Sequence, residues 1–151
     1  MSKKMVEKTG MIGVWEFVLR DKATGKIISK DTVKNLIVNN GLERMARRLG
    51  SAVDFFNTIK IGTGTNAAGN TDTALQTLYA SELATTIEYE ASYKFVWAKT
   101  FTFGSGVSED ITEAGLFDGS SVMFNRVVTT AKSVSEAVDL TVTVTITVAR
   151  V

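Results

Sequence analysis

Carboxylates that lie close together in the sequence are the side chains best suited to acid–base chemistry in this chain. Glu88 and Glu90 are two residues apart, so they share one face if their segment is a β-strand. Such a pair can cleave a glycosidic bond only in a cleft where one carboxyl group is buried and keeps its proton. The other face of this segment is aromatic, and we therefore expect both carboxylates to point to water.

A second acidic group, formed by Glu109, Asp110 and Glu113, lies next to an expected turn. Clustered carboxylates can bind calcium, but this group lacks the Asp-x-Asp-x-Asp-Gly spacing of a calcium-binding loop. The 151 residues also contain no histidine and no cysteine, which excludes a Ser-His-Asp triad, a Cys-His pair and a zinc site. We predict a non-enzymatic protein without a metal or a cofactor.

The segment 62–67, Gly-Thr-Gly-Thr-Asn-Ala, has the glycine spacing of a dinucleotide-binding loop and follows an expected strand. In that motif a helix starts at the loop, so that backbone N–H groups and the helix dipole meet the pyrophosphate. Here the polar residues 69–72 intervene before a helix can begin, and no second βα unit follows. We therefore predict no nucleotide binding at this loop.

The charge of the chain is nearly balanced in total but uneven along the sequence. The net charge of +1 is too small to predict nucleic acid or a membrane as a partner, and no apolar stretch is long enough to cross a membrane. Residues 1–50 nevertheless carry a formal charge of +6, and residues 51–151 a charge of −5. This division suits association with other copies or with a charged neighbour, although ordinary solvated surface charge gives the same pattern.

The N-terminal region is expected to form an arm and a hairpin. Residues 1–10 are polar and charged, and we assign them to an arm. Residues 11–34 alternate weakly on both sides of a short turn in which Gly25 can supply a positive φ, which predicts a β-hairpin.

Two segments have the spacing of amphipathic helices. Residues 39–49 place apolar side chains on one face, with Asn39 or Asn40 as the cap and Gly50 as the left-handed residue after the end. A second short helix is predicted over 73–83 from a capping-box spacing and an apolar stripe. The outer face of the first helix is basic, through Arg44, Arg47 and Arg48.

Most of the remaining chain has the alternation of β-strands. The apolar residues of 85–103 alternate with polar ones. A single strand of this length would span about 60 Å, so this run must bend sharply, change sheets or project from the body. Residues 138–148 alternate Val, Leu and Ile with Thr and predict a central strand. The fold class is therefore mainly β, a β-sandwich or open β-barrel with two short helices, as a single domain over 11–151.

The order of several short motifs resembles a group of small structural proteins of tailed bacteriophages, over residues 35–148. This chain lacks the proline that follows the Gly-Thr-Gly-Thr loop in that group, and residues 1–34 lie outside the resemblance. The motifs are NLIVNNGL (35–42), ARRL (46–49), IKIGTGT (59–65), TDTAL (71–75), ITEAGLF (111–117) and MFNRVV (123–128).

The resemblance implies a structural role in the virion. We expect a capsid decoration or cement protein, because the 151 residues include no fibre shaft or receptor-binding domain. A tail or tail-fibre-associated component is the first alternative. The second is a carbohydrate-binding module that uses the acidic pair Glu88 and Glu90 and the aromatic row of the same segment, which consists of Tyr89, Tyr93, Phe95 and Trp97. We expect a homo-oligomer, most simply a trimer, whose partners are its own copies and a capsid or tail protein. The expected interface residues are Lys3, Lys4, Lys8, Arg44, Arg47, Arg48, Glu88 and Glu90.

Overall fold

The computed structural model describes residues 9–150, which form ten β-strands and one α-helix. The chain is therefore mainly β, as predicted. The elements in chain order are β1 (Thr9–Asp21), β2 (Ile27–Lys34), β3 (Leu36–Ile37), α1 (Asn39–Arg48), β4 (Phe56–Gly62), β5 (Leu78–Leu83), β6 (Thr86–Glu90), β7 (Lys94–Thr102), β8 (Glu109–Asp118), β9 (Met123–Val134) and β10 (Val138–Arg150).

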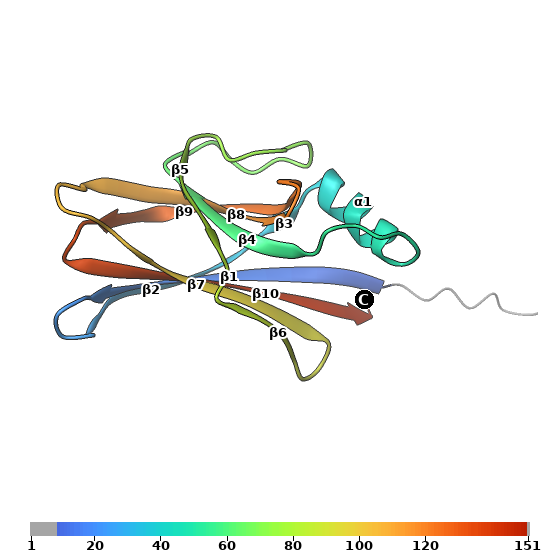
Figure 1. The fold of residues 1–151 in the computed structure, drawn as a ribbon, viewed down its shortest axis with the longest axis horizontal. Coiled ribbons are helices and arrows are strands. Elements are labelled where there is room, and N and C mark those ends of the chain that lie inside the picture. Colours follow the sequence, from blue (N-terminus) through green and yellow to red (C-terminus); the bar gives the residue numbers. More distant parts are fainter. Residues whose placement is uncertain (1–8, 151) are drawn as a thin grey trace, which may run out of the picture.

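The strands form two antiparallel sheets that face each other as two layers (Figure 1). Sheet A has the order β2-β1-β10-β7-β6, and sheet B has the order β3-β9-β8-β4-β5. This is the layered arrangement of a β-sandwich, one of the two architectures expected from the sequence. The helix α1 lies at one end of the molecule, next to the first residues of β1 and the last residues of β10 (Figure 1).

The core lies between the two sheets and follows the alternation of the sequence. In β10, the inward side chains of Leu140, Val142 and Val144 are fully buried, as predicted for a central strand. Apolar burial of this kind stabilises a fold by roughly 1.5–3 kcal/mol for each such side chain. Trp97 in β7 also ties the layers together, because its indole N–H donates a 2.7 Å hydrogen bond to the carbonyl oxygen of Phe56.

The second predicted helix is wrong, because residues 78–83 form strand β5 and residues 73–77 are irregular. The side chain of Gln76 does not cap a helix but accepts hydrogen bonds from the loop amides of Thr65 and Asn66, both at 2.9 Å. The amide of Thr77 donates to a carboxylate from sheet B. The Gln76 side chain and the Thr77 amide are therefore engaged by the loop and by sheet B, and the capping-box spacing does not start a helix.

The alternating run 85–103 bends sharply, which is one of the three outcomes expected for it. It forms the antiparallel hairpin β6–β7, with a turn at 91–93 in which Ser92 and Tyr93 both have positive φ. Before the hairpin, Ala84 and Thr85 carry the chain from sheet B to sheet A. The turn contains no glycine or asparagine, so ordinary hairpin signals do not mark it.

Two further boundaries differ from those predicted. Thr9 and Gly10, assigned to the arm, are the first residues of β1 and pair with Arg150 and Ala149 of β10. Helix α1 begins at Asn39 with Val38 in the cap position, so the predicted cap at Asn39 or Asn40 is wrong, and within the described residues no side chain caps the helix. Gly25 does have a positive φ of 73°, whereas Gly50 does not adopt the left-handed conformation predicted for it.

Candidate interaction surface

An apolar groove opens where α1, the residues before β4 and the β6–β7 hairpin meet. Its volume is about 440 Å³. The walls are almost entirely aromatic and aliphatic, and the charged side chains that line it are those of Arg48 and Lys94. The residues that define the groove here are Met45, Phe55, Tyr89, Phe95, Trp97 and Val148.

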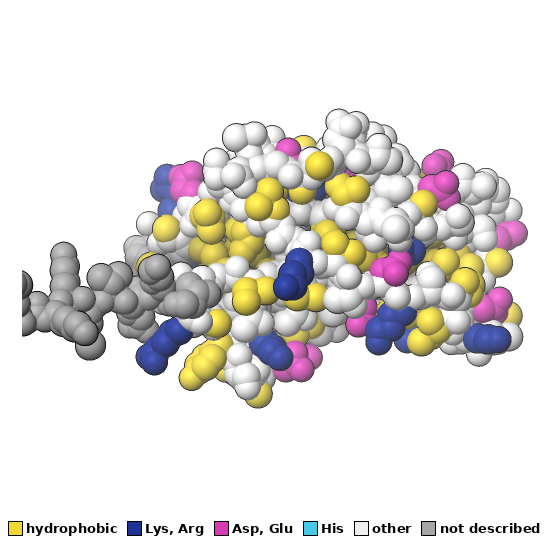
Figure 2. Space-filling view, turned by 180° about the vertical axis from the view of Figure 1, so that it is seen from behind, with side chains coloured by type: hydrophobic (Ala, Val, Ile, Leu, Met, Phe, Trp, Pro, Cys, Tyr) yellow, Lys and Arg dark blue, Asp and Glu magenta, His cyan; other side chains and the backbone are white. Residues whose placement is uncertain are grey.

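Large apolar side chains remain exposed around this groove. Phe55 is 54% exposed, Tyr89 is 64% exposed and Tyr93, at the tip of the hairpin, is 73% exposed. Met45 and Val148 also line a second, neighbouring apolar hollow. Hydrophobic side chains gather on the surface at this end of the molecule (Figure 2). An apolar region of this kind on a folded chain is typical of an interaction site.

The three arginines expected at an interface lie on α1 beside the groove, but they differ in their contacts. Arg44 lies 3.3 Å from the buried carboxylate of Asp118, and Arg47 forms a 2.7 Å ion pair with Glu43 on the same helix. Arg48 donates a hydrogen bond to the carbonyl oxygen of Val53 and lines the groove. Arg44 therefore has a structural role in addition to any role in binding.

Glu88 and Glu90 are both exposed on β6, as expected. They do not line the groove, whereas Ile87 and Tyr89 of the same strand do. Successive side chains of a strand point to opposite faces, so the carboxylates lie on the outer face of sheet A and the aromatic row on the inner face. A site that combines this acidic pair with the aromatic row is therefore not formed within one copy.

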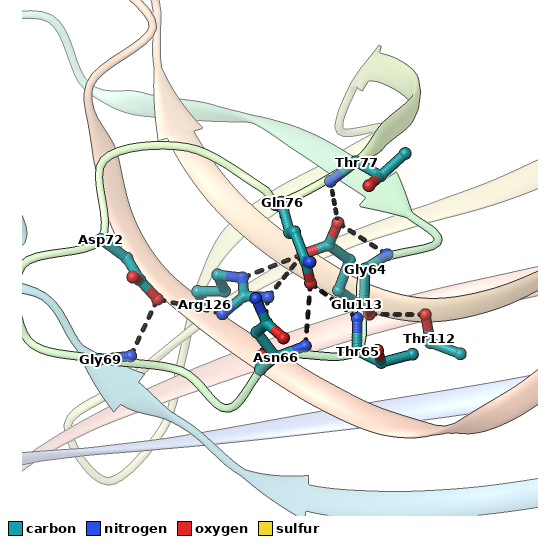
Figure 3. Close-up of polar contacts among 10 residues, drawn as sticks. All are labelled: Gly64, Thr65, Asn66, Gly69, Asp72, Gln76, Thr77, Thr112, Glu113 and Arg126. Carbon is teal, nitrogen blue, oxygen red and sulfur yellow. Dashed lines mark hydrogen bonds and ion pairs between the residues drawn. The ribbon is translucent and has the colours of Figure 1, made fainter.

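The loop 63–77 between β4 and β5 is held by a buried ion pair that the sequence analysis missed (Figure 3). Glu113 of β8 is completely buried, and Arg126 of β9 is 2% exposed. The two side chains form a 2.8 Å ion pair, and Arg126 also lies 3.1 Å from the carboxylate of Asp72 in the loop. The Glu113 carboxylate accepts amide hydrogen bonds from Gly64 at 3.0 Å and Thr77 at 2.7 Å.

This arrangement explains the glycine spacing that resembled a nucleotide-binding loop. A Cβ atom on Gly62 or on Gly64 would lie 2.6 Å from the Oε1 atom of Glu113. The glycines are needed because the chain's own carboxylate approaches the loop backbone this closely. The Glu113 carboxylate thus accepts the hydrogen bond of the Gly64 amide, the kind of group that a phosphate would need.

The acidic group near the β7–β8 connection is divided by the structure. Glu109 and Asp110 are exposed, while Glu113 points into the buried ion pair. Within residues 9–150, no group of three or more Asp and Glu side chains is arranged to hold a metal ion. In the same range, no helix is long and apolar enough to span a membrane.

The remaining expected interface residues, Lys3, Lys4 and Lys8, lie outside the described residues. Phe55 is a groove residue that the sequence pattern does not single out. The opposite wall of the groove comes from the alternating run 85–103, through Ile87, Tyr89, Phe95 and Trp97. Comparisons with protein-family models, with curated proteins and with solved structures find no match for this chain.

Proposed function

We propose that this chain is a non-enzymatic structural protein of a bacteriophage particle, a capsid decoration protein that binds and stabilises the shell as a trimer or another small homo-oligomer. The resemblance of residues 35–148 to small phage structural proteins supports the phage assignment. The observation that carries the binding role is the exposed apolar groove beside the basic helix. Its lining of aromatic side chains with Met45 and Arg48 has the composition that is enriched in protein–protein interfaces.

The partner that fits this surface is an acidic protein surface with a protruding apolar side chain. The groove supplies the apolar contact, and Arg48 at the end of α1 supplies positive charge beside it. The chain carries further positive charge before Thr9, at Lys3, Lys4 and Lys8. Complementary charge of this kind steers association and excludes like-charged partners.

Stoichiometry tests the location in the particle. The number of copies per purified virion is measured by quantitative mass spectrometry against the major capsid protein. A decoration protein is expected in hundreds of copies, in proportion to the shell. A few copies, or a few tens, would contradict decoration and indicate the tail or fibre.

Phe55→Ser tests the groove itself. Truncation of a central aromatic side chain commonly weakens an interface by about 2 kcal/mol, or roughly 30-fold. We expect a corresponding loss of binding to particles that lack the protein, measured by co-sedimentation. The matched control is Leu83→Ser, because Leu83 is 64% exposed on β5 and does not line the groove. Equal binding by both variants would contradict a role for the groove.

Two further choices keep such tests free of folding defects. Arg44 should be retained, since its removal would leave the buried carboxylate of Asp118 without its cation. A deletion of the arm should end at Lys8, because Thr9 and Gly10 belong to the β1–β10 pairing. If the protein that lacks residues 2–8 no longer binds particles, the basic residues of this segment contribute to binding.

A further inference from the structure

Sheet A has two free-standing edges of opposite charge. The strands β2 and β6 are the outermost strands of this sheet, so within residues 9–150 each has a neighbouring strand on one side only. The outer face of β2 carries Lys30 and Lys34, whereas that of β6 carries Glu88 and Glu90. The backbone of an edge strand can hydrogen-bond to a strand of another chain.

The two edges run in the same direction. Every neighbouring pair in sheet A is antiparallel, so the chain direction alternates across the five strands and returns at the fifth. If a second copy is related to the first by rotation about an axis parallel to the strands, its β2 can pair with β6 as a parallel neighbour.

The register of the sheet determines which residues would then meet. Following the paired residues across the five strands, one row starts at Lys34 and passes through Val14, Thr145 and Val96 to Glu88. We take these rows to continue from one copy into the next without a shift along the strands. Glu88 of one copy would therefore lie beside Lys34 of the next.

The two adjacent rows are also complementary. The first joins Val33 at the β2 edge to Ile87 at the β6 edge, and the second joins Thr32 to Thr86. Ile87 is 37% exposed, so a neighbouring valine would cover apolar surface. Three rows thus cross the whole sheet. At a contact between two copies they would bring together opposite charges, two aliphatic side chains and two threonines.

Like edges do not match in this way. A contact between two β6 strands would oppose Glu88 and Glu90 to the same residues of the other copy, and a contact between two β2 strands would oppose lysines. Like charges on facing strands destabilise a pair, so the charges select the unlike contact.

We infer that copies of this chain associate by parallel pairing of β6 in one copy with β2 in the next, with Glu88 beside Lys34. The contact is heterologous, so it closes a ring where the rotation permits and otherwise continues as an open array. The inference rests on the homo-oligomer of the proposed function, but not on the site in the virion to which the oligomer binds.

Charge reversal tests the pairing in the full 151-residue chain. Sedimentation velocity over the micromolar range gives the association constant of the wild type, of Glu88→Lys, of Lys34→Glu and of the double variant. Each single variant places like charges in contact and is expected to weaken association about tenfold. The double variant restores opposite charges and should return to within about threefold of the wild type.

Lys30→Glu is the matched control. Lys30 lies on the same strand and face as Lys34, but its row ends at Thr100 of β7, where β6 is absent. This variant should leave association nearly unchanged. Circular dichroism and the melting temperature establish that each variant is folded, since all the altered side chains are exposed.

Three results would overturn the inference: a wild type that is monomeric throughout, single variants that associate normally, or a double variant no better than the single ones. Binding to particles is measured separately. If association does not depend on these charges while particle binding persists, the pairing is wrong and the proposed function stands. If the charges behave as expected but no particle binds the protein, the pairing stands and the decoration role is wrong.

Discussion

The buried Glu113–Arg126 pair is the residue contact on which the loop 63–77 depends most. Glu113→Gln keeps the shape of the side chain but removes its charge, leaving Arg126 buried without its principal partner. Breaking a buried ion pair from one side commonly costs about 3–5 kcal/mol of unfolding free energy. We expect a loss of this size in urea unfolding followed by tryptophan fluorescence. Glu109→Gln, an exposed change on the same strand, is the control and should alter stability by less than about 0.5 kcal/mol.

Asp31 gives the protein an acid-sensitive contact between the layers. Hydrogen bonds from Lys132 and Thr130 and the positive charge of Lys132 hold the pKa of Asp31 below its usual value of 3.8. A pKa that is lower in the folded state adds stability above the unfolded value and loses it as the pH falls through the folded value. The melting temperature of Asp31→Asn should therefore be lower than that of the wild type at neutral pH. This difference should shrink below pH 3.8; a constant difference down to pH 2 would contradict the assignment.

The placement of α1 against sheet B depends on a close backbone contact at one glycine. A Cβ atom on Gly41 would lie 2.2 Å from the carbonyl oxygen of Phe124, so Gly41→Ala must displace the helix or the strand. Overpacking of this kind commonly costs about 1–3 kcal/mol, more than the gain in helix propensity. We expect a lower melting temperature and weaker particle binding, because α1 carries Met45 and Arg48 into the groove.

Gly50→Ala provides the comparison for this helix. Among residues 9–150, nothing lies within 4 Å of the Cβ position of Gly50, so its substitution should leave the melting temperature nearly unchanged. Equal effects of the two substitutions would show that the contact with Phe124 does not hold the helix in place.

The strands that alternate in sequence were predictable, whereas those defined by distant contacts were not. The Thr/Val pattern of β10 specifies one buried face by itself, because the side-chain period of a strand is two. The local spacing of residues 73–83 predicts a helix. It cannot show that the amides of Gln76 and Thr77 donate to the carboxylate of Glu113, which lies far away in the sequence. The hairpin at 91–93 was not located because Ser92 and Tyr93 are unusual residues for positive φ.

The candidate surface was partly predictable for the same physical reason. Aromatic alternation indicated the wall that contains Tyr89 and Trp97, and the helical spacing placed Arg48 on α1. Neither pattern shows that helix α1 and the β6–β7 hairpin lie on either side of Phe55. That arrangement is visible only in the folded structure. The buried position of Arg126 follows from its place in the apolar segment 122–128, a signal that was available in the sequence.

The charge division of the sequence does not become a division of the molecule into two halves. Strand β1, from the basic region, lies between β2 and β10 in sheet A, so the two regions of the sequence are interleaved. The separation that remains is between the edges of one sheet, with lysines on β2 and glutamates on β6. This spatial separation, rather than the totals along the chain, supports association between copies.

Folding of the whole chain requires its two ends to meet, because Thr9 pairs with Arg150 and β10 lies at the centre of sheet A. Pairing over such sequence separations is slow, so refolding after dilution from urea should take milliseconds to seconds. The sequence has no proline, and a phase of tens of seconds from prolyl isomerisation is therefore not expected. Stopped-flow tryptophan fluorescence measures both features, and refolding in microseconds would contradict the topological argument.

A chain that ends at residue 137 lacks β10 and should remain unfolded by circular dichroism, whereas a native-like spectrum would show that sheet A forms without its central strand.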